Sequence, residues 1–327
     1  MGIGIVGTGR CLPPRVVDNH EISRFVDTSD EWIVSRTGIR ARRFADRAVT
    51  SSDLGAEAAC AALASAGLRA EHVDAIIVAT SSPDWIQPAT ACAVQRKVGA
   101  RSAAAFDVGA VCAGFVYGLA VGCGLMTAFS DLRNVLVVGA ETYSKLLDFQ
   151  DRTSSVFFGD GAGAVVLGRV PQDYGILGVK LIADGRLTDV VMVPAGGGAL
   201  PATEDTVRRR QHSFRMDGGR VWEYVTRELP RVVREALSTA GLDVDDVDVF
   251  VFHQANARLL EACMTGLGAD AGRMVCTVEE FGNTAAASVP ITLHAAALGG
   301  RLTRGSTVVL GAVGGGMTAG AAVLRWY

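Results

Sequence analysis

Short runs of consecutive apolar residues alternate along the chain with longer stretches that have apolar residues at helical spacing. In 61–84, a stretch rich in alanine and leucine ends at Gly67, a short acidic loop follows, and the apolar run 75–79 comes next. Glycine suits the left-handed conformation that ends many helices, and a continuous apolar run of this length is typical of a strand buried on both faces. The pattern predicts a helix, a glycine cap and a buried strand, in that order.

The same arrangement occurs again in 235–256. At an offset of 174 residues, Gly67 and Asp74 of the first copy align with Gly241 and Asp248 of the second. A repeat of this length, in which helix, cap and strand all recur, is the signature of an internal duplication.

A second match pairs the apolar run 134–141 with 306–316 at nearly the same offset. Strands that alternate with helices in both halves predict mostly parallel sheets with helices on their faces. We divide the chain into an N-terminal half, 1–172, and a C-terminal half, 173–327. The irregular segment 184–214 is expected to be a long surface loop or flap.

The composition fits a globular α/β protein, with 49% hydrophobic and 20% charged residues and a formal net charge of -3. This charge gives no overall basic field, and only the run 208–210 is locally basic, so nucleic acid is not an expected partner. The N-terminus lacks the features of a secretory signal, which predicts a cytoplasmic protein. No window offers roughly 20 continuous apolar residues free of charge and of repeated glycine, so no membrane span is expected.

The seven cysteines are widely scattered and never spaced as CxxC, which argues against a disulfide framework and against a zinc site. We expect no metal, and we expect most of these cysteines to be buried free thiols.

Cys112 is the strongest candidate nucleophile. It follows an apolar strand and small residues, and a helix-compatible stretch begins beside it. A thiol at a helix N-terminus has its pKa lowered by the backbone N–H groups, and its own N–H can help to form an oxyanion hole. A buried structural thiol explains the local sequence equally well.

His253 and Asn283 are the other candidates. His253 directly follows a buried strand, where sites of parallel sheets gather, although a lone histidine is more often a satisfied core or surface residue. Asn283 precedes a run of small residues, and N-capping by Asn283 or Thr284 accounts for it as well. The glycine clusters 158–168 and 311–320 fit neither a dinucleotide nor a phosphate loop, so they indicate close backbone approach beside the thiol.

Several motifs together resemble the β-ketoacyl-acyl-carrier-protein synthase III family of the thiolase superfamily. They are DVGAVCAGF around Cys112, HQAN from His253, FGNTAAAS around Asn283 and the terminal GGGMTAGAAVLRW. The resemblance implies a five-layered αβαβα fold of two duplicated halves, a homodimer and a two-stage Claisen condensation in fatty-acid or polyketide biosynthesis. It implies a CoA thioester as substrate, acyl carrier protein as partner and no cofactor.

The resemblance also assigns roles to residues. An acyl-CoA would acylate Cys112, and His253 and Asn283 would bind the carbonyl of a malonyl-carrier thioester as it loses CO₂. The remaining implied positions are the N–H groups of Cys112 and Gly315 as the oxyanion hole, Trp32 and Arg152 around the CoA adenine, and Arg36 and Arg258 near the CoA phosphates or the carrier. Trp32 could instead only anchor a helix, and the arginines could be surface charge.

Four positions depart from the family pattern. Gly219 and Glu223 remove positive charge where CoA or the carrier docks, Val313 replaces a shielding phenylalanine, and Gln87 stands at the end of the acyl pocket of the partner subunit. These changes suggest a specialised-metabolism member of the family, such as one that selects a polyketide starter, rather than one of housekeeping fatty-acid initiation. Two alternatives remain. A non-decarboxylating acyltransferase is disfavoured by the retention of Asn283. A silent acyl-binding subunit is disfavoured by the retention of all three residues Cys112, His253 and Asn283.

Overall fold

The computed structural model describes all 327 residues and contains two stacked β-sheets. The first sheet has five strands in the order β1-β7-β6-β4-β5. Their bounds are β1 Gly2–Cys11, β7 Gly161–Val170, β6 Val135–Glu141, β4 Ala75–Ala79 and β5 Ala104–Val108. β4 runs parallel to β5 and β6, whereas β7 runs antiparallel to β1 and β6.

The second sheet has the order β11-β12-β13-β8. Its strands are β11 Val249–Phe252, β12 Thr307–Gly314, β13 Thr318–Arg325 and β8 Gly175–Ala183. Only β11 and β12 are parallel, so the prediction of mostly parallel sheets is wrong and both sheets are mixed. The reason is that β12 returns to β13 through a tight turn, and such a connection imposes antiparallel pairing.

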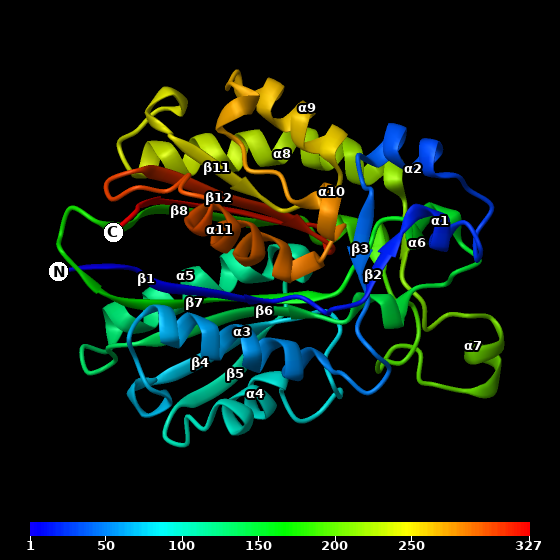
Figure 1. Cartoon of the computed structure of the whole chain (residues 1–327), viewed down its shortest axis with the longest axis horizontal. Coiled ribbons are helices and arrows are strands. Elements are labelled where there is room, and N and C mark those ends of the chain that lie inside the picture. The colour runs from blue at the N-terminus through cyan, green and yellow to red at the C-terminus, as the bar shows by residue number, and fades with distance from the viewer.

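Helices form the other three layers, so the five-layered αβαβα arrangement predicted from the sequence is confirmed (Figure 1). The outer layers are α3 (Ser51–Ser65) with α4 (Thr90–Val98) on the first sheet, and α8 (Gly218–Thr239) with α9 (Ala257–Leu267) on the second. Between the sheets lie α5 (Gly114–Ala128) and α11 (Ser288–Leu298).

The central helix α5, together with the turn before it, is the one helical segment long and apolar enough to cross a membrane by length and composition. Its position explains the apolarity, because Phe115, Val116 and Leu119 have no exposed surface and pack between the two sheets. The apolar composition of α5, which would suit a membrane span, is therefore that of a buried core helix.

The duplicated unit has the predicted structure in both copies. α3 and α8 each end beside a glycine in the left-handed conformation, Gly67 at φ 67° and Gly241 at φ 69°. The strands β4 and β11 that follow are fully buried. The strands divide between the sheets after Val170 and before Gly175.

Shorter elements surround this core. They are α1 Asn19–Ile22, α2 Asp30–Thr37, α6 Arg152–Ser155, α7 Glu204–Arg208, α10 Val278–Phe281, β2 Val16–Asp18, β3 Ala41–Arg43, β9 Val191–Met192 and β10 Arg215–Met216. The segment 184–214 is largely irregular, as expected of a flap, and in Figure 1 its helix α7 projects from the body of the molecule.

Two expectations from composition change. All seven cysteines are free, but only Cys263 is buried, so the prediction of mostly buried thiols is wrong. Cys60 in α3 and Cys92 in α4, for example, lie on the exposed faces of their helices. The charge of the basic run 208–210 is partly compensated, because its three arginines form ion pairs with two carboxylates, those of Asp205 and Asp148.

Candidate active site

A largely apolar cavity lies where the two halves meet. It has a volume of about 940 Å³ including its open mouth, and 16 of its 22 lining residues are hydrophobic. Four residues predicted from the sequence line it together: Cys112, His253, Asn283 and Gly315. No charged side chain lines the cavity, so its polar groups act in a medium that screens them weakly.

Cys112 lies in a tight turn between β5 and α5. The preceding residue, Val111, has a φ of 47°, which is rare for a branched side chain and marks a backbone held by its surroundings. Thr318 Oγ1 donates to Ala110 O at 3.0 Å. A side chain on Gly314 would come within 2.8 Å of the Cys112 backbone nitrogen, so the glycine cluster serves close backbone approach, as the sequence predicted.

The electrostatic environment of Cys112 differs from the prediction. Burial, and secondly the nearby Glu141 carboxylate, raise the pKa of the Cys112 thiol well above its ordinary value. The expected lowering is therefore wrong for the unliganded protein, because desolvation outweighs the help of the helix N-terminus.

His253 follows β11 and is held from both sides. Its Nδ1 lies 2.6 Å from Ser288 Oγ, and Gln254 N–H donates to the same oxygen at 3.2 Å. The Ser288 hydroxyl can donate to Nδ1, and in that tautomer the ring proton is on Nε2. Burial lowers the pKa of His253 to about 4, so the imidazole is neutral at neutral pH.

Asn283 uses its two amide ends differently. Its Oδ1 accepts from Ala285 N at 2.9 Å, which closes a local side-chain turn in front of Ala285–Ala287, whose own N-cap residue, Thr284, makes no side-chain cap bond. Its backbone is fixed by Phe157, whose carbonyl accepts from Asn283 N at 2.8 Å. The turn-closing role and the site role coexist, because the Nδ2 donor makes no hydrogen bond to the protein and the residue lines the cavity.

Sequence reasoning missed Glu141, which ends the buried strand β6 with no exposed surface. Its carboxylate accepts from Ser81 N at 3.0 Å, Ser82 N at 3.0 Å and Ala286 N at 3.3 Å. Burial raises its pKa to about 7. The signal was present in the sequence, since an acidic residue that closes a fully apolar strand requires internal partners.

Three aromatic rings form a wall beside the thiol. Tyr143 and Phe158 are stacked with centroids 4.4 Å apart, and Phe214 meets both edge to face at 5.4 and 4.8 Å. Cys112 packs against this cluster. The rings therefore close one side of the space next to Sγ.

The predicted CoA-binding residues lie near the cavity but do not line it. The Arg152 guanidinium is 5.0 Å from the centre of the Trp32 ring, so the two are already in contact and would have to separate to admit a purine. Arg258 is paired with Glu261, and its Nε donates to Ser35 O at 3.4 Å. Arg36 is exposed on the same helix as Trp32.

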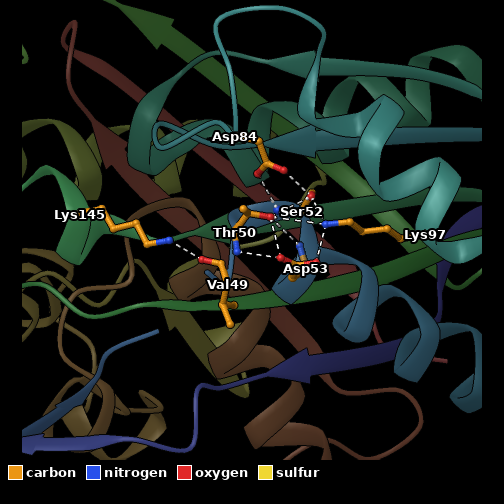
Figure 2. Close-up of polar contacts among 7 residues, drawn as sticks. All are labelled: Val49, Thr50, Ser52, Asp53, Asp84, Lys97 and Lys145. Atoms are coloured by element: carbon orange, nitrogen blue, oxygen red, sulfur yellow. Dashed lines mark hydrogen bonds and ion pairs between the residues drawn. The ribbon is translucent and has the colours of Figure 1, made fainter. Parts of the chain in front are cut away.

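Gln87 does not line the cavity of its own chain. It is exposed in the loop after β4, in a shallow surface hollow with Trp85 and Pro88. Figure 2 shows how this loop is held: Asp84 accepts from Ser52 N at 3.0 Å, at the start of α3. Its predicted acyl-pocket role concerns a partner subunit and stays a prediction.

The cluster in Figure 2 ties the first turn of α3 to α4. Lys97 Nζ donates to Ser52 Oγ at 2.6 Å and forms an ion pair with Asp53 at 2.5 Å. Thr50 and Asp53 complete a capping box. All of these groups have partners within the protein, so the cluster fixes the loop and the helices rather than forming a site.

The other departures lie around the cavity. Val313 lines it, whereas Gly219 and Glu223 are exposed on the first turns of α8, outside the cavity, and Glu223 lies 3.8 Å from Arg227. The structure contains no group of three His, Cys, Asp or Glu side chains that could hold a metal ion.

Comparison with known proteins agrees with this geometry. Residues 106–185 match the family model of 3-oxoacyl-[acyl-carrier-protein (ACP)] synthase III, and 237–326 match the model of its C-terminal region. The chain is 48% identical to the β-ketoacyl-[acyl-carrier-protein] synthase III of Rhodospirillum centenum, with 98% of each chain covered. It is 44% identical to that of Desulfitobacterium hafniense strain Y51, covering 100% of this chain and 98% of the relative.

The fold agrees too. The crystal structure of 3-oxoacyl-(acyl carrier protein) synthase III from Pseudomonas aeruginosa PAO1 superposes with a TM-score of 0.91 at 40% identity, covering 100% of this chain and 98% of that one. Fold and sequence define a thiolase-like condensing enzyme, an acyltransferase. The chain belongs to the β-ketoacyl-acyl-carrier-protein synthase III family, whose reaction serves fatty-acid biosynthesis.

Proposed function

We propose that Cys112 takes an acyl group from an acyl-CoA and that a malonyl-carrier thioester then condenses with it. In the first step the Cys112 thiolate attacks the thioester carbonyl, and CoA leaves with a proton. In the second step the malonyl group loses CO₂, the new carbanion bonds to the acyl carbon, and the bond to Cys112 breaks. The observation that carries the proposal is the convergence of Cys112, His253 and Asn283 in one cavity without charged side chains.

Neutral donors suit the decarboxylation step. A His253 Nε2–H and the free Asn283 Nδ2–H would both point donors at a thioester carbonyl that gains negative charge as CO₂ leaves. Each such donor is worth about 10²–10³ in rate.

The experiment measures both half-reactions. Intact-mass analysis after incubation with acetyl-CoA should show one added acetyl group, and release of CO₂ from malonyl thioester should follow. Acetylation without CO₂ release would instead favour the non-decarboxylating acyltransferase.

We infer a homodimer from exposed features near Gln87. Ile86 is 82% exposed and Trp85 is 53% exposed, and β5 is an edge strand of the first sheet. Bare edges and exposed apolar side chains favour association with a second copy. Light scattering of the purified protein tests this, and a monomer at micromolar concentration would refute it. The acyl carrier partner and the cytoplasmic location likewise stay predictions from the sequence.

A further inference from the structure

A charged side chain is buried next to the backbone of Asn283. Arg42, the middle residue of β3, has no exposed surface. Its Nη1 donates to Asn19 Oδ1 at 2.7 Å and its Nη2 donates to Val156 O at 2.6 Å, whereas its Nε has no partner. Burial lowers the pKa of Arg42 to about 10, so the guanidinium keeps its charge at neutral pH.

Stability alone does not account for this guanidinium. Its acceptors are a side-chain amide oxygen and backbone carbonyl oxygens, all of them neutral, and Arg42 forms no ion pair with a carboxylate. A buried charge without a charged partner costs free energy that an apolar side chain of similar volume does not. What Arg42 supplies instead is a planar fork of donors that fixes two segments at once.

The fork joins the helices that carry the predicted CoA-binding residues. Asn19 lies at the start of α1, and its Nδ2 donates in turn to Asp30 Oδ1 at 2.8 Å, in the first turn of α2. Val156 directly follows α6. Arg42 therefore holds α1, α2 and α6 together from the inside.

The aliphatic stem of Arg42 packs against the backbone around Asn283. Gly282 comes directly before Asn283, and Gly159 N–H donates to Asn283 O at 2.9 Å. A Cβ on Gly282 would lie 3.1 Å from Arg42 Cβ, and one on Gly159 would lie 3.0 Å from it, so both glycines permit this close approach. Asn283 N donates to Phe157 O at 2.8 Å, in the residue that follows the Nη2 acceptor. Arg42 thus contacts the two segments that fix the backbone of Asn283.

We propose that Arg42 is a positioning residue, which fixes the backbone of Asn283 against α1, α2 and α6 and so holds its Nδ2 donor toward the cavity. This rests on the proposed function, in which that donor binds the carbonyl of the malonyl thioester. Arg42 does not line the cavity and touches no reacting group, so its effect on the reaction passes through Asn283.

The test removes the fork and keeps an unbranched stem, in Arg42→Met. The maximal rate of Cys112 acetylation should change little, while kcat for CO₂ release at saturating malonyl thioester should fall by about 10- to 100-fold, the loss expected for a displaced donor. Arg43→Met is the matched control, because its side chain points to the other face of β3 and donates to Pro14 O at 3.2 Å. The proposal is overturned if Arg42→Met releases CO₂ at the wild-type rate, or if Arg43→Met loses as much.

A double-mutant cycle separates positioning from a general loss of structure. In an Asn283→Ala background, Arg42→Met should cause no further loss in kcat for CO₂ release, because the group that it positions is absent. Losses that multiply in the double variant would overturn the proposal. If Arg42→Met does not fold, Arg42→Lys takes its place, since it keeps the charge but offers one nitrogen instead of two and should restore the rate only in part.

The position of Asn283 can also be measured without catalysis. The chain has four asparagines, so selective ¹⁵N labelling gives four side-chain amide signals, those of Asn19, Asn134, Asn256 and Asn283. In Arg42→Met the signals of Asn19 and Asn283 should shift, whereas that of Asn134, whose Nδ2 donates to His72 O, should not. An unmoved Asn283 signal would refute the positioning role even in an active enzyme. A shifted signal, combined with CO₂ release at the wild-type rate in Asn283→Ala, would support the positioning role and reject the proposed reaction role of the amide.

Discussion

Two tight turns meet at the centre of the molecule, one before each of the central helices α5 and α11, and they share a backbone conformation. Val111 has a φ of 47° and Ala285 a φ of 43°, and each is the first residue of a short 3-10 turn. The two residues are 174 positions apart, the offset of the sequence repeat. The duplication thus preserved an uncommon backbone and changed its side chains.

The same offset pairs Cys112 with Ala286, and the register of the duplicated strands, in which β4 Ala75 pairs with Val135 and β11 Val249 pairs with Val308, places Glu141 opposite Gly314. In the C-terminal turn, Ala286 N–H donates to the Glu141 carboxylate, so the protein supplies its own anion. In the N-terminal turn, the counterpart of that carboxylate is Gly314, which has no side chain, and the cavity opens there. The C-terminal turn therefore binds an internal anion and has a structural role, whereas the N-terminal turn is free to bind a substrate oxyanion.

The largest expected effect comes from removing the Cys112 thiol, which is the chemical difference between the two turns. Cys112→Ser should lower acylation by about a thousandfold or more, because a hydroxyl is a far weaker nucleophile than a thiol at neutral pH. Intact mass after incubation with acetyl-CoA measures it. Cys123→Ser, in the same helix region, is the control and should still take one acetyl group. Acetyl mass on Cys123 or Cys11 in the wild type would reject the assignment.

Asn283→Ala tests the donor that precedes the C-terminal turn. It should still form acyl-enzyme but release CO₂ from malonyl thioester about 10²–10³-fold more slowly, since it removes the Nδ2 donor. His253→Ala should behave similarly. Condensation at the wild-type rate in Asn283→Ala would show that the amide only closes the turn through Ala285 N.

The buried groups of the two turns predict opposite pH dependences. Glu141 has its pKa raised to about 7, so the folded state retains a proton that the unfolded state loses, and stability falls as pH rises from about 4.5 to 7. His253 has its pKa lowered to about 4, so stability rises with pH from about 4 to 6.5. Each contribution amounts to about 3 kcal/mol across its window.

In the wild type the pH dependences of stability that come from Glu141 and His253 oppose each other, so single variants should reveal each of them. Glu141→Gln leaves the His253 contribution, so its free energy of unfolding should rise with pH relative to the wild type between about 4.5 and 6.5. His253→Ala leaves the Glu141 contribution and should show a fall. Guanidinium unfolding at several pH values gives both slopes, and slopes of the same sign would contradict the assignments.

The sequence predicted the backbone of this site better than its electrostatics. The duplication, both glycine caps and the places of Cys112 and His253 follow from local patterns of apolar and small residues. The lowered pKa expected for Cys112 is wrong, because the pKa depends first on burial and then on Glu141, which is close in space but distant in the sequence, and no local pattern contains either.

The cavity lining was beyond sequence reasoning for a related reason. Val225 and Leu259 look like ordinary core residues, and only the packing of α8 and α9 places them in the lining of the same cavity as Cys112. The prediction of strand direction was wrong for the same reason, because the β12-β13 turn, and not the apolar pattern, sets the antiparallel pairing.

The smallest expected effect compares the starts of the duplicated outer helices. Thr50 Oγ1 caps α3 by accepting from Asp53 N, within the cluster of Figure 2, and Asp217 Oδ1 caps α8 by accepting from Gly219 N and Arg220 N, both at 3.1 Å. Thr50→Ala and Asp217→Ala should each lower the free energy of unfolding by about 1 kcal/mol, the usual loss of an N-cap. Only the second helix start borders the cavity, through Gly218, so only Asp217→Ala should also raise KM for acyl-CoA, by a fewfold. Chemical unfolding and steady-state kinetics measure the two quantities separately. Equal changes in KM would mean that fraying of either helix start reaches the site, and that the two duplicated helices are not functionally distinct.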